Sequence, residues 1–497
     1  MVRVTSTDPT LPEDADVVVI GSGAGGAITA ATLAEAGRHV LILEEGPTTA
    51  AGASVMHSPE AMRTLYRHAG LSPILAKSAI AFVEGRCVGG STEVNSGFWH
   101  RPPATAIARW AQRYGVRDLA EDQLGEVLVD IERTLRPATS GGDLPPSSQV
   151  FGAGLRALGL PARETPRLQR GDPTRSQFES QTKASMSRTY LPRATAAGAT
   201  LVSGCRARRL HHRDGRVAEV EVVFARKEGG SERRRIRART VFVCGGAVQT
   251  PALLRRSGIK RRIGDSLRIQ PMLKVAARFD DRLDAHASVM PVYQMRDPGC
   301  DFFFGGSVFT PGFLGMCLSD HWPENEPALE DWRQMGIYYT ACRGSARGTV
   351  RVFPGTGEAI IRYPISRQDQ LNLSMGMAKL CEVLFAGGST RVYPGVRGVP
   401  SLRDPDDVRR LLASSGRHGI PVRRMSISTV HVTSSCPMGE NLDHCPVDSF
   451  GKVRDFDNLH LADASIIPDA PGVNPQGTVM ALALRNARHF LDRGGAG

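Results

Sequence analysis

Near the start of the chain, a run of closely spaced glycines suits the binding of a dinucleotide pyrophosphate. The run is Gly21-Ser22-Gly23-Ala24-Gly25-Gly26, a GxGxxG pattern. Gly21 allows a tight turn, Gly23 lets the backbone approach a phosphate, and Gly26 lets the next helix pack closely on a strand. Glu44 follows at the spacing of an acid that accepts hydrogen bonds from ribose hydroxyls. The pattern predicts a nucleotide site and does not distinguish NAD from FAD.

The elements expected around this turn form one βαβ unit. Residues 16–20 (DVVVI) and 39–43 (HVLIL) are short apolar runs, typical of buried parallel strands. Residues 27–36 are rich in alanine, predict a helix, and are followed by Gly37. Further along the chain, residues 201–224 predict a strand hairpin with its turn at 213–216, and residues 240–244 predict another buried strand.

Cysteine and histidine near the C-terminus offer a second candidate for chemistry, a metal site. His431, Cys436, His444 and Cys445 lie close together in the sequence, but their irregular spacing does not match zinc-binding templates. The chain has nine cysteines and no C-x-x-C pair, which is typical of small buried residues in a reduced protein. No metal site is predicted.

Length and composition exclude several classes of protein. The chain has 497 residues, of which 41% are hydrophobic and 23% charged, too apolar a composition for a disordered chain and long enough for two or more domains. No apolar stretch approaches the ~18 residues of a membrane-spanning helix, so no membrane partner is expected. Residues 1–16 are acidic and lack the apolar region of a signal peptide, so a cytoplasmic location is expected.

The net charge is +12, from 62 Lys and Arg against 50 Asp and Glu. Arginines are dispersed along the chain, and the one dense run, at 233–239, lies beside acidic residues and is expected to be a solvated turn. No nucleic-acid partner is therefore predicted. Residues 297–332 contain no Lys or Arg, and their acids are Asp297, Asp301, Asp320, Glu324, Glu326, Glu330 and Asp331. This window is either an acidic surface loop or a wall that attracts a cationic substrate.

Three further stretches carry a resemblance to a known family. Residues 85–95 (GRCVGGSTEVN) are followed by Trp99 and Pro102, and residues 246–259 (GAVQTPALLRRSGI) are followed by Lys260, where the family usually has glycine. The C-terminal block begins with 431–439 (HVTSSCPMG), continues through 447–448 and 458–468, and ends with 472–483 (GVNPQGTVMALA). With the glycine turn, these motifs resemble those of the glucose–methanol–choline (GMC) oxidoreductases, in the same order.

The resemblance implies an α/β fold with additional β structure. An FAD-binding Rossmann-type βαβ domain would be built from the discontinuous segments 1–100, 195–275 and 430–497. A substrate-binding domain, 101–194 and 276–429, would place an antiparallel sheet over the flavin. The cofactor implied is FAD, and it is expected to be non-covalent because Val94 stands where members with a histidyl-linked flavin have histidine.

The family pattern also implies which residues contact FAD. Besides Gly21, Ser22, Gly23, Gly26 and Glu44, these are Arg86, Gly89, Gly90, Ser91, Thr92, Asn95, Arg206, Asp463, Ala464, Asn474, Pro475 and Thr478. The segment 89–92 would line the ribityl chain and ring, and residues 463–464 the pyrophosphate–ribityl part. Residues 474, 475 and 478 would approach the pyrimidine end, and the backbone near Arg206 would meet adenine.

Oxidation of an alcohol requires loss of a proton and of a hydride. Histidine is the base best suited to neutral pH, flavin N5 accepts the hydride, and a hydrogen-bond donor stabilises the developing alkoxide. His431 and Asn474 match the family's catalytic pair, so the resemblance implies FAD-dependent oxidation of a small-molecule alcohol, with oxygen or another electron acceptor.

The favoured substrate is the primary hydroxyl of a polar, cationic amino-sugar compound of the aminoglycoside type, because the acidic window 297–332 would suit ammonium groups. The C-terminal motif also resembles that of a branch whose members act in aminoglycoside antibiotic pathways. Asp320, Glu324 and Glu330 would bind the ammonium groups of the substrate. The alternatives are a sterol or long-chain alcohol oxidase and an FAD-containing hydroxynitrile lyase. The sequence indicates neither the electron acceptor nor the oligomeric state.

Overall fold

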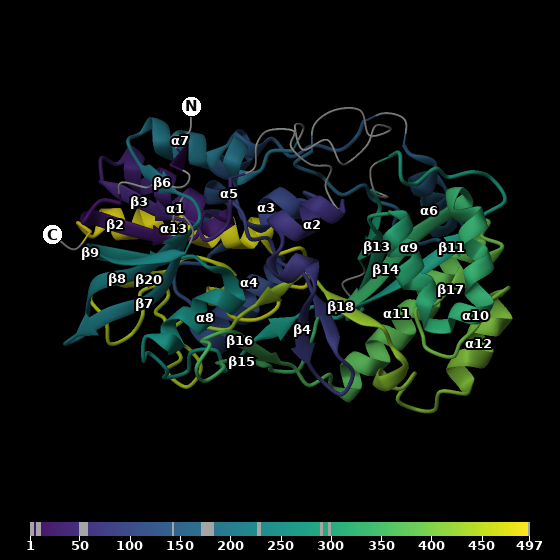
Figure 1. Ribbon diagram of the computed structural model, residues 1–497. Helices are drawn as coiled ribbons and strands as arrows, with labels where there is room; N and C mark the ends of the chain where they lie inside the picture. The colour runs from purple at the N-terminus through teal and green to yellow at the C-terminus, as the bar shows by residue number, and fades with distance from the viewer. Residues whose placement is uncertain are drawn as a thin grey trace.

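The computed structural model describes residues 4–5, 11–48, 58–141, 144–169, 183–225, 230–288, 292–296 and 300–495. Two β-sheets lie side by side, each with its own helices (Figure 1). The chain passes between them several times, because strands from early, middle and late parts of the sequence pair in each sheet. No described helix has both the length and the apolar composition that crossing a membrane requires.

The first sheet has the strand order β1-β6-β3-β2-β9-β8-β7, and β20 also pairs with β9. The strands are β1 (Val4–Thr5), β2 (Asp14–Ile20), β3 (Val40–Leu43), β6 (Thr200–Val202), β7 (Cys205–Arg213), β8 (Arg216–Ala225), β9 (Ser231–Val243) and β20 (Leu459–Leu461). All pairings are parallel except β7–β8 and β8–β9. The predicted βαβ unit, hairpin and buried strand are confirmed, with helix α1 (Ala24–Glu35) starting three residues earlier than expected.

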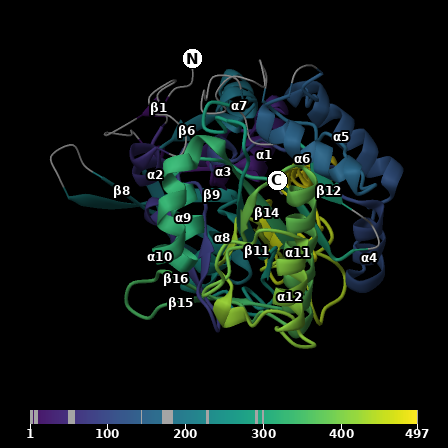
Figure 2. The same cartoon turned by 90° about the vertical axis from the view of Figure 1, so that its right-hand side faces the viewer.

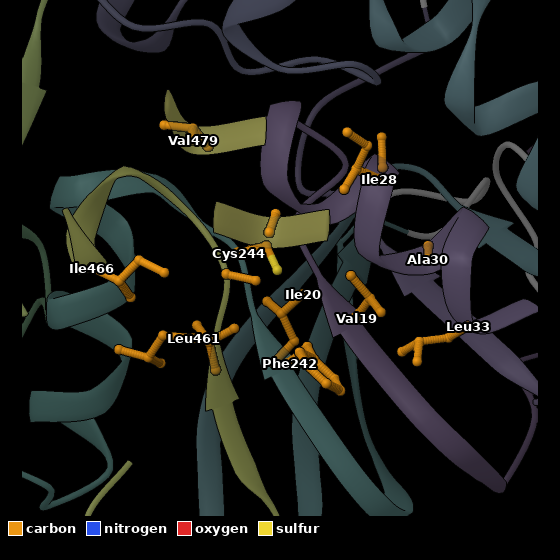
Figure 3. Close-up of a cluster of buried hydrophobic side chains, with 14 of the residues drawn as sticks. Val19, Ile20, Ile28, Ala30, Leu33, Phe242, Cys244, Leu461, Ile466 and Val479 are labelled. Atoms are coloured by element: carbon orange, nitrogen blue, oxygen red, sulfur yellow. The ribbon is translucent and has the colours of Figure 1, made fainter. Parts of the chain in front are cut away.

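The core of this half lies between the sheet and helices α1 and α13 (Gln476–Asp492), which pack on each other. Val19 and Ile20 of β2, Phe242 of β9 and Leu461 of β20 belong to one buried cluster (Figure 3). The same cluster contains Ile28 and Leu33 of α1 and Val479 of α13. Every residue of β3 is buried, and so are residues 17–20 of β2, as expected for a parallel sheet covered on both faces.

The second sheet has the order β12-β13-β14-β11-β18-β5-β4-β16-β15, and β17 pairs with β11. The strands are β4 (Ser72–Leu75), β5 (Ile80–Phe82), β11 (Met272–Arg278), β12 (Gln294–Arg296), β13 (Phe302–Gly306), β14 (Met335–Cys342), β15 (Thr349–Val352), β16 (Ala359–Arg362), β17 (Arg391–Tyr393) and β18 (Ile427–Thr429). Most pairings are antiparallel, as predicted. Strands β4 and β5 belong to this second sheet, although segment 1–100 was predicted to be part of the FAD-binding domain. The predicted domain boundaries stay a proposal.

Helix α11 (Arg367–Ala386) covers one face of this sheet, with α6 (Pro146–Ala157) and α12 (Pro405–Ala413) beside it (Figure 2). A capping box formed by Ser366 and Asp369 starts α11. Strand β14 is buried throughout, and its side chains alternate between the two faces. Tyr338 and Cys342 belong to the core under α11, whereas Tyr339 and Ala341 point to the opposite face.

The remaining helices surround the two sheets. They are α2 (Pro59–Leu65), α3 (Ser91–Val94), α4 (Ala104–Tyr114), α5 (Glu121–Leu135), α7 (Tyr190–Ala196), α8 (Gly246–Arg256), α9 (Pro311–Leu318) and α10 (Trp322–Asn325), with 3-10 turns at Arg67–Gly70, Met186–Arg188, Ser319–His321, Glu326–Gln334, Val422–Arg424 and Ala464–Ile466.

The arginine run at 233–239 lies in strand β9 rather than in a turn, and several of its members pair with acids, among them Arg235 with Glu219. The hairpin tip at 226–229 lies outside the described residues.

Candidate active site

The glycine turn between β2 and α1 brings backbone against backbone. Gly21 has φ of +105°, and a Cβ there would lie 2.5 Å from the carbonyl oxygen of Cys244. Gly23 faces Gly90 of the 85–95 motif, where a Cβ on Gly90 would lie 2.9 Å from the Gly23 Cα. No side chain caps α1, and its first turn contains no acid. The turn is therefore a backbone surface with free N–H groups at a helix N-terminus, which suits a phosphate anion.

Glu44 lies buried at the end of β3 and organises this turn. Its carboxylate accepts hydrogen bonds from Ser22 N at 3.0 Å, Ser22 Oγ at 2.7 Å and Gly46 N at 2.8 Å. Gly89 N in turn donates to Ser22 Oγ at 3.0 Å. Burial raises the pKa of Glu44 above its ordinary value, although these hydrogen bonds act in the opposite direction. The structure thus places Glu44 beside the turn, and its contact with a ribose stays a prediction.

The first motif forms the short helix α3 and its approach. Thr92 Oγ1 donates to Gly89 O at 2.7 Å, and Ser91 Oγ accepts from Gly85 N at 3.0 Å. Asn95 Nδ2 donates to Gln476 Oε1 at 2.6 Å, which ties this motif to the start of α13. Asn95 therefore lies beside the segment that contains the predicted cofactor residues 474, 475 and 478.

Of the predicted cofactor residues, Arg206 has a side chain paired with acids and Arg86 is exposed. The side chain of Arg206 pairs with Glu358 at 3.0 Å and lies 3.7 Å from Glu45. Arg86 is exposed, and its backbone N–H donates to Leu65 O. The predicted adenine contact concerns the backbone near Arg206, so the side-chain pairs leave it open.

The C-terminal block contributes Asp463, which lies against the glycine turn at Gly25, and Thr478, in α13. Asp463 accepts hydrogen bonds from Gly246 N at 2.8 Å and Ser465 N at 2.7 Å, and burial raises its pKa. Ala464 O accepts from Ser434 N at 3.0 Å. The hydroxyl of Thr478, in the first turn of α13, is buried and has no partner among the described residues. Pro475 is the N-cap of α13, so no side chain caps that helix either.

His431 is placed by an irregularity between two antiparallel segments. Met272 pairs with Ser428 in the second sheet, and Ile269 pairs with Val432 in the small ribbon of β10 (Arg268–Ile269) and β19 (Val432–Thr433). Two residues on one segment therefore stand opposite three on the other, which is a β-bulge. Such a bulge re-aims side chains, and here it brings His431 beside Gln270.

Four side chains form a chain of hydrogen bonds around His431. Gln270 Nε2 donates to Val473 O at 3.1 Å, and Gln270 Oε1 lies 2.7 Å from His431 Nδ1. Because the amide oxygen can only accept, Nδ1 carries the proton and Nε2 is the free acceptor. Asn474 Nδ2 lies 3.2 Å from that Nε2, and Arg296 donates to Asn474 Oδ1 at 3.2 Å. The backbone carbonyl of Val473 thus orients the Gln270 amide, and Arg296 orients the Asn474 amide.

The electrostatics keep His431 neutral. Burial lowers the pKa of His431 to about 3, and the positive charges of Arg296 and Lys274 act in the same direction. A neutral imidazole with an accepting Nε2 next to an amide donor can take a proton from a hydroxyl and stabilise the oxygen that remains.

His431 and Asn474 were predicted from the sequence, whereas Gln270, Arg296 and Lys274, whose side chains act on them in the structure, were not. The available signal was a polar residue among apolar ones, as in residues 269–277 (IQPMLKVAA), which run from the end of β10 into β11. Strand alternation alone does not say which face such a residue occupies or what it meets across the sheet.

The three acids predicted to bind substrate do not join this network in the structure. Asp320 accepts a hydrogen bond from Ser426 Oγ at 2.5 Å and lies 3.7 Å from Arg397. Glu324 pairs with His321 at 3.0 Å, and Glu330 is exposed. Asp297, at the start of the acidic window, lies outside the described residues. Within the described ranges no group of three or more His, Cys, Asp or Glu side chains could hold a metal ion.

Comparison with family models matches most of the chain. Residues 62–272 match the N-terminal GMC oxidoreductase model, and residues 346–483 match the C-terminal one. Residues 19–68 match an NAD(P)-binding Rossmann-like domain.

Similar sequences and structures extend over nearly the whole chain. A GMC-type oxidoreductase of Sinorhizobium fredii, itself uncharacterized, is 36% identical over 98% of this chain and 96% of its own length. A long-chain-alcohol oxidase of Arabidopsis thaliana is 24% identical over 94% of this chain and 66% of its own length. A 6'''-hydroxyparomomycin C oxidase of Streptomyces lividus is 27% identical over 95% of this chain and 90% of its own length. The crystal structure of pyridoxine 4-oxidase from Mesorbium loti has a similar fold, with a TM-score of 0.72, 18% identity and coverage of 96% and 99%.

Proposed function

The chain belongs to the GMC oxidoreductase family, whose members act on alcohols, and we propose that His431 and Asn474 are the pair that oxidises the alcohol here. One observation carries the proposal. The accepting Nε2 of His431 and the donating Nδ2 of Asn474 lie 3.2 Å apart, both oriented by their neighbours. A base and a donor are thus held where one hydroxyl oxygen could meet both.

Enzymes of this family bind FAD, and the residues of this chain fit that cofactor. Gly23 and Gly90 leave a backbone-lined cradle that a Cβ would fill, and the N-terminus of α1 beside it has no capping side chain. At the start of α13 the Thr478 hydroxyl is buried and has no partner among the described residues, so a bound ligand could supply its hydrogen bond. We propose that the pyrophosphate lies at α1 and the flavin between α3 and the start of α13, without a covalent bond to residue 94.

In the proposed reaction, His431 Nε2 accepts the proton of the substrate hydroxyl while Asn474 Nδ2 donates a hydrogen bond to its oxygen. Bound FAD supplies the acceptor for the hydride that leaves the carbon. The alcohol carbon thereby loses two electrons and becomes a carbonyl, and the proton stays on the imidazole until it passes to solvent. Gln270 keeps the positive imidazolium oriented through its contact with Nδ1.

The finer substrate proposal, a cationic amino sugar, has support from one relative. The Streptomyces lividus protein is named an oxidase of a hydroxyparomomycin. The acids at 320, 324 and 330 would be the ammonium partners, at a distance from the reacting carbon. The alternative, a long-chain alcohol, is supported by the Arabidopsis relatives, which are named long-chain-alcohol oxidases. Arg296 and Lys274 beside His431 weigh against an ammonium group next to the oxidised carbon.

The proposal is tested by anaerobic flavin reduction with a panel of primary alcohols, comparing wild type with His431→Ala. We expect bleaching by at least one alcohol in wild type and its loss in the variant, with the FAD content unchanged. Reduction by the variant at near-wild-type rate would exclude His431 as the base. Cleavage of a cyanohydrin without bleaching would instead favour a lyase. Reoxidation by oxygen or by a dye then distinguishes an oxidase from a dehydrogenase.

A further inference from the structure

A buried lysine contacts the motif that is predicted to line the flavin. Only 6% of Lys183 is exposed, and its ammonium donates to Glu93 O and Asn95 O, each at 2.7 Å. Glu93 lies in α3 and Asn95 is its C-cap, so both carbonyls lie at the helix end, where carbonyls have no partner within the helix. A lysine ammonium at a helix C-terminus satisfies these groups and complements their negative dipole. Lys183 thus fixes the end of α3 from a position 90 residues away from Glu93 in the sequence.

Segment 183–187 also holds this motif through its backbone. Met186 N donates to Thr92 Oγ1 at 3.1 Å, and Ser187 N donates to Glu93 Oε1 at 3.2 Å. The segment therefore braces the motif beside which the flavin is proposed to lie, and its lysine contributes the positive charge.

The charge of Lys183 exceeds what these hydrogen bonds require. Neutral N–H groups satisfy other acceptors of the motif, as Met186 N does at Thr92. A buried ammonium is costly by comparison. Burial lowers the pKa of Lys183 to about 8, although Glu93 acts in the opposite direction, so the ammonium still keeps its proton at pH 7. A positive charge retained at this cost indicates an electrostatic role in addition to a structural one.

From these contacts we propose that Lys183 is a positioning residue of the FAD site, which holds the 89–95 motif and supplies positive charge that favours the reduced flavin. The inference rests on the placement of the flavin beside α3 under the proposed function, and it adds a residue that controls the redox equilibrium. When an alcohol is oxidised, its C–H bond breaks and a hydride, which is two electrons and one proton, passes to the flavin, while the hydroxyl proton passes to His431. The flavin thereby gains negative charge, which a nearby cation stabilises.

The structural and electrostatic contributions of Lys183 can be separated by linkage. The potential of bound FAD differs from that of free FAD according to how much more tightly the protein binds the reduced than the oxidised form. A purely structural lysine would change both affinities equally and leave the potential unchanged. A lysine that acts through its charge would change the affinity for the reduced form more, and the potential would move.

The test compares the FAD-loaded wild type with Lys183→Met, which removes the charge and the donor, and with Lys183→Gln, which keeps a donor without the charge. Potentials are measured at pH 7 by stepwise reduction with dithionite in equilibrium with a reference dye. In both variants we expect the equilibrium constant for reduction to fall at least about tenfold, which lowers the two-electron potential by ~30 mV or more. Titration of the apoproteins with FAD should show about 10-fold weaker binding for Lys183→Met and a smaller loss for Lys183→Gln.

Lys379→Met is the matched control, because Lys379 is a partly exposed lysine of α11 that pairs with Glu382. Its potential and FAD affinity should equal those of wild type. A wild-type potential in both Lys183 variants would overturn the electrostatic role, and an unchanged FAD affinity in Lys183→Met would overturn the positioning role. If the methionine variant folds poorly, the glutamine variant decides through its potential alone.

Neither measurement uses an alcohol, so this inference and the proposed function fail separately. If alcohols reduce the flavin through His431 but the potential does not depend on Lys183, the inference fails and the function stands. If no alcohol reduces the flavin, the proposed function fails, and the dithionite potentials still decide whether Lys183 acts on the cofactor.

Discussion

Gln270 Oε1 lies 2.7 Å from His431 Nδ1, and this contact decides which nitrogen of the imidazole carries the proton. The Gln270 amide is itself oriented by donating to Val473 O, one residue before Asn474. Residues 473–474 therefore supply the donor, Asn474, and also orient His431 through Gln270. Histidine in an unsupported position would interconvert between two tautomers, and only the Nδ1–H form leaves Nε2 free to accept a proton.

Gln270→Leu should slow flavin reduction by about 10- to 100-fold, because His431 loses the partner that holds its tautomer. Stopped-flow reduction by a good alcohol measures the rate, and flavin absorbance checks that FAD stays bound. Gln270→Glu is the informative counterpart, since a carboxylate next to Nδ1–H should raise the pKa of His431. If the acidic limb of the rate profile does not move in Gln270→Glu, the contact does not act through the imidazole.

Asn474→Ala should lower the rate of flavin reduction by about 10²- to 10³-fold, because the developing alkoxide loses its donor. The effect should appear in kcat and kcat/KM alike, as expected for an interaction made mainly in the transition state. A change confined to KM would assign Asn474 to substrate binding alone.

The pH dependence of activity follows from the low pKa of His431, about 3. A base must be neutral to accept a proton, so kcat/KM for a neutral alcohol should stay nearly constant from pH 8 down to pH 5. Steady-state rates at constant ionic strength test this. A decline with a midpoint near pH 6.5 would mean that His431 has its ordinary pKa and is not desolvated as described.

Acid stability should depend on His460, whose pKa burial lowers to about 3. Its ring stacks on Phe242 with the centroids 4.8 Å apart. A depressed folded-state pKa contributes stability that is present above the ordinary value of 6.5 and is lost as the pH falls toward 3. At pH 5 this loss is about 2 kcal/mol relative to pH 7.5.

Urea unfolding of wild type and His460→Phe at pH 7.5 and pH 5 measures that loss, with the exposed His39→Gln as control. The phenylalanine variant should lose less stability between the two pH values than either wild type or the control. Identical losses in all three proteins would show that His460 does not resist protonation in the folded state.

Gly90→Ala should impair FAD binding while the protein remains folded. The new Cβ would lie 2.9 Å from the Gly23 Cα, and Gly90 has φ of +58°, which disfavours alanine. Flavin fluorescence titration of the apoprotein should show at least about 10-fold weaker binding, equivalent to ~1.4 kcal/mol. Gly125→Ala is the control, because nothing lies within 4 Å of a Cβ there. Unchanged FAD affinity in Gly90→Ala would mean that the Gly23–Gly90 contact does not form the cradle.

The local elements were predictable because their causes are local. The run at 16–20, the glycine turn and the alanine-rich segment predict strand, turn and helix from side-chain shape and backbone freedom alone, and the structure confirms them. The exact helix start was not predictable, since helix ends depend on neighbouring contacts. The arginine run at 233–239 was assigned to a turn because charge suggests exposure. In strand β9, residues 233–235 are all exposed, and Arg237 and Arg239 alternate with buried residues, so the strand carries the charge on its exposed positions.

The sequence by itself determined the family, the cofactor and the chemistry to look for, because the motifs that carry them are short segments whose residues act together. Only the tertiary structure decided what surrounds His431. Gln270, Arg296 and Lys274 lie far from Asn474 in the sequence. A two-against-three bulge brings Gln270 beside His431, and Arg296 reaches Asn474 from strand β12. The charge of the site is a sum over such distant residues, so an acidic stretch in the sequence did not predict it, and two cations lie beside the imidazole.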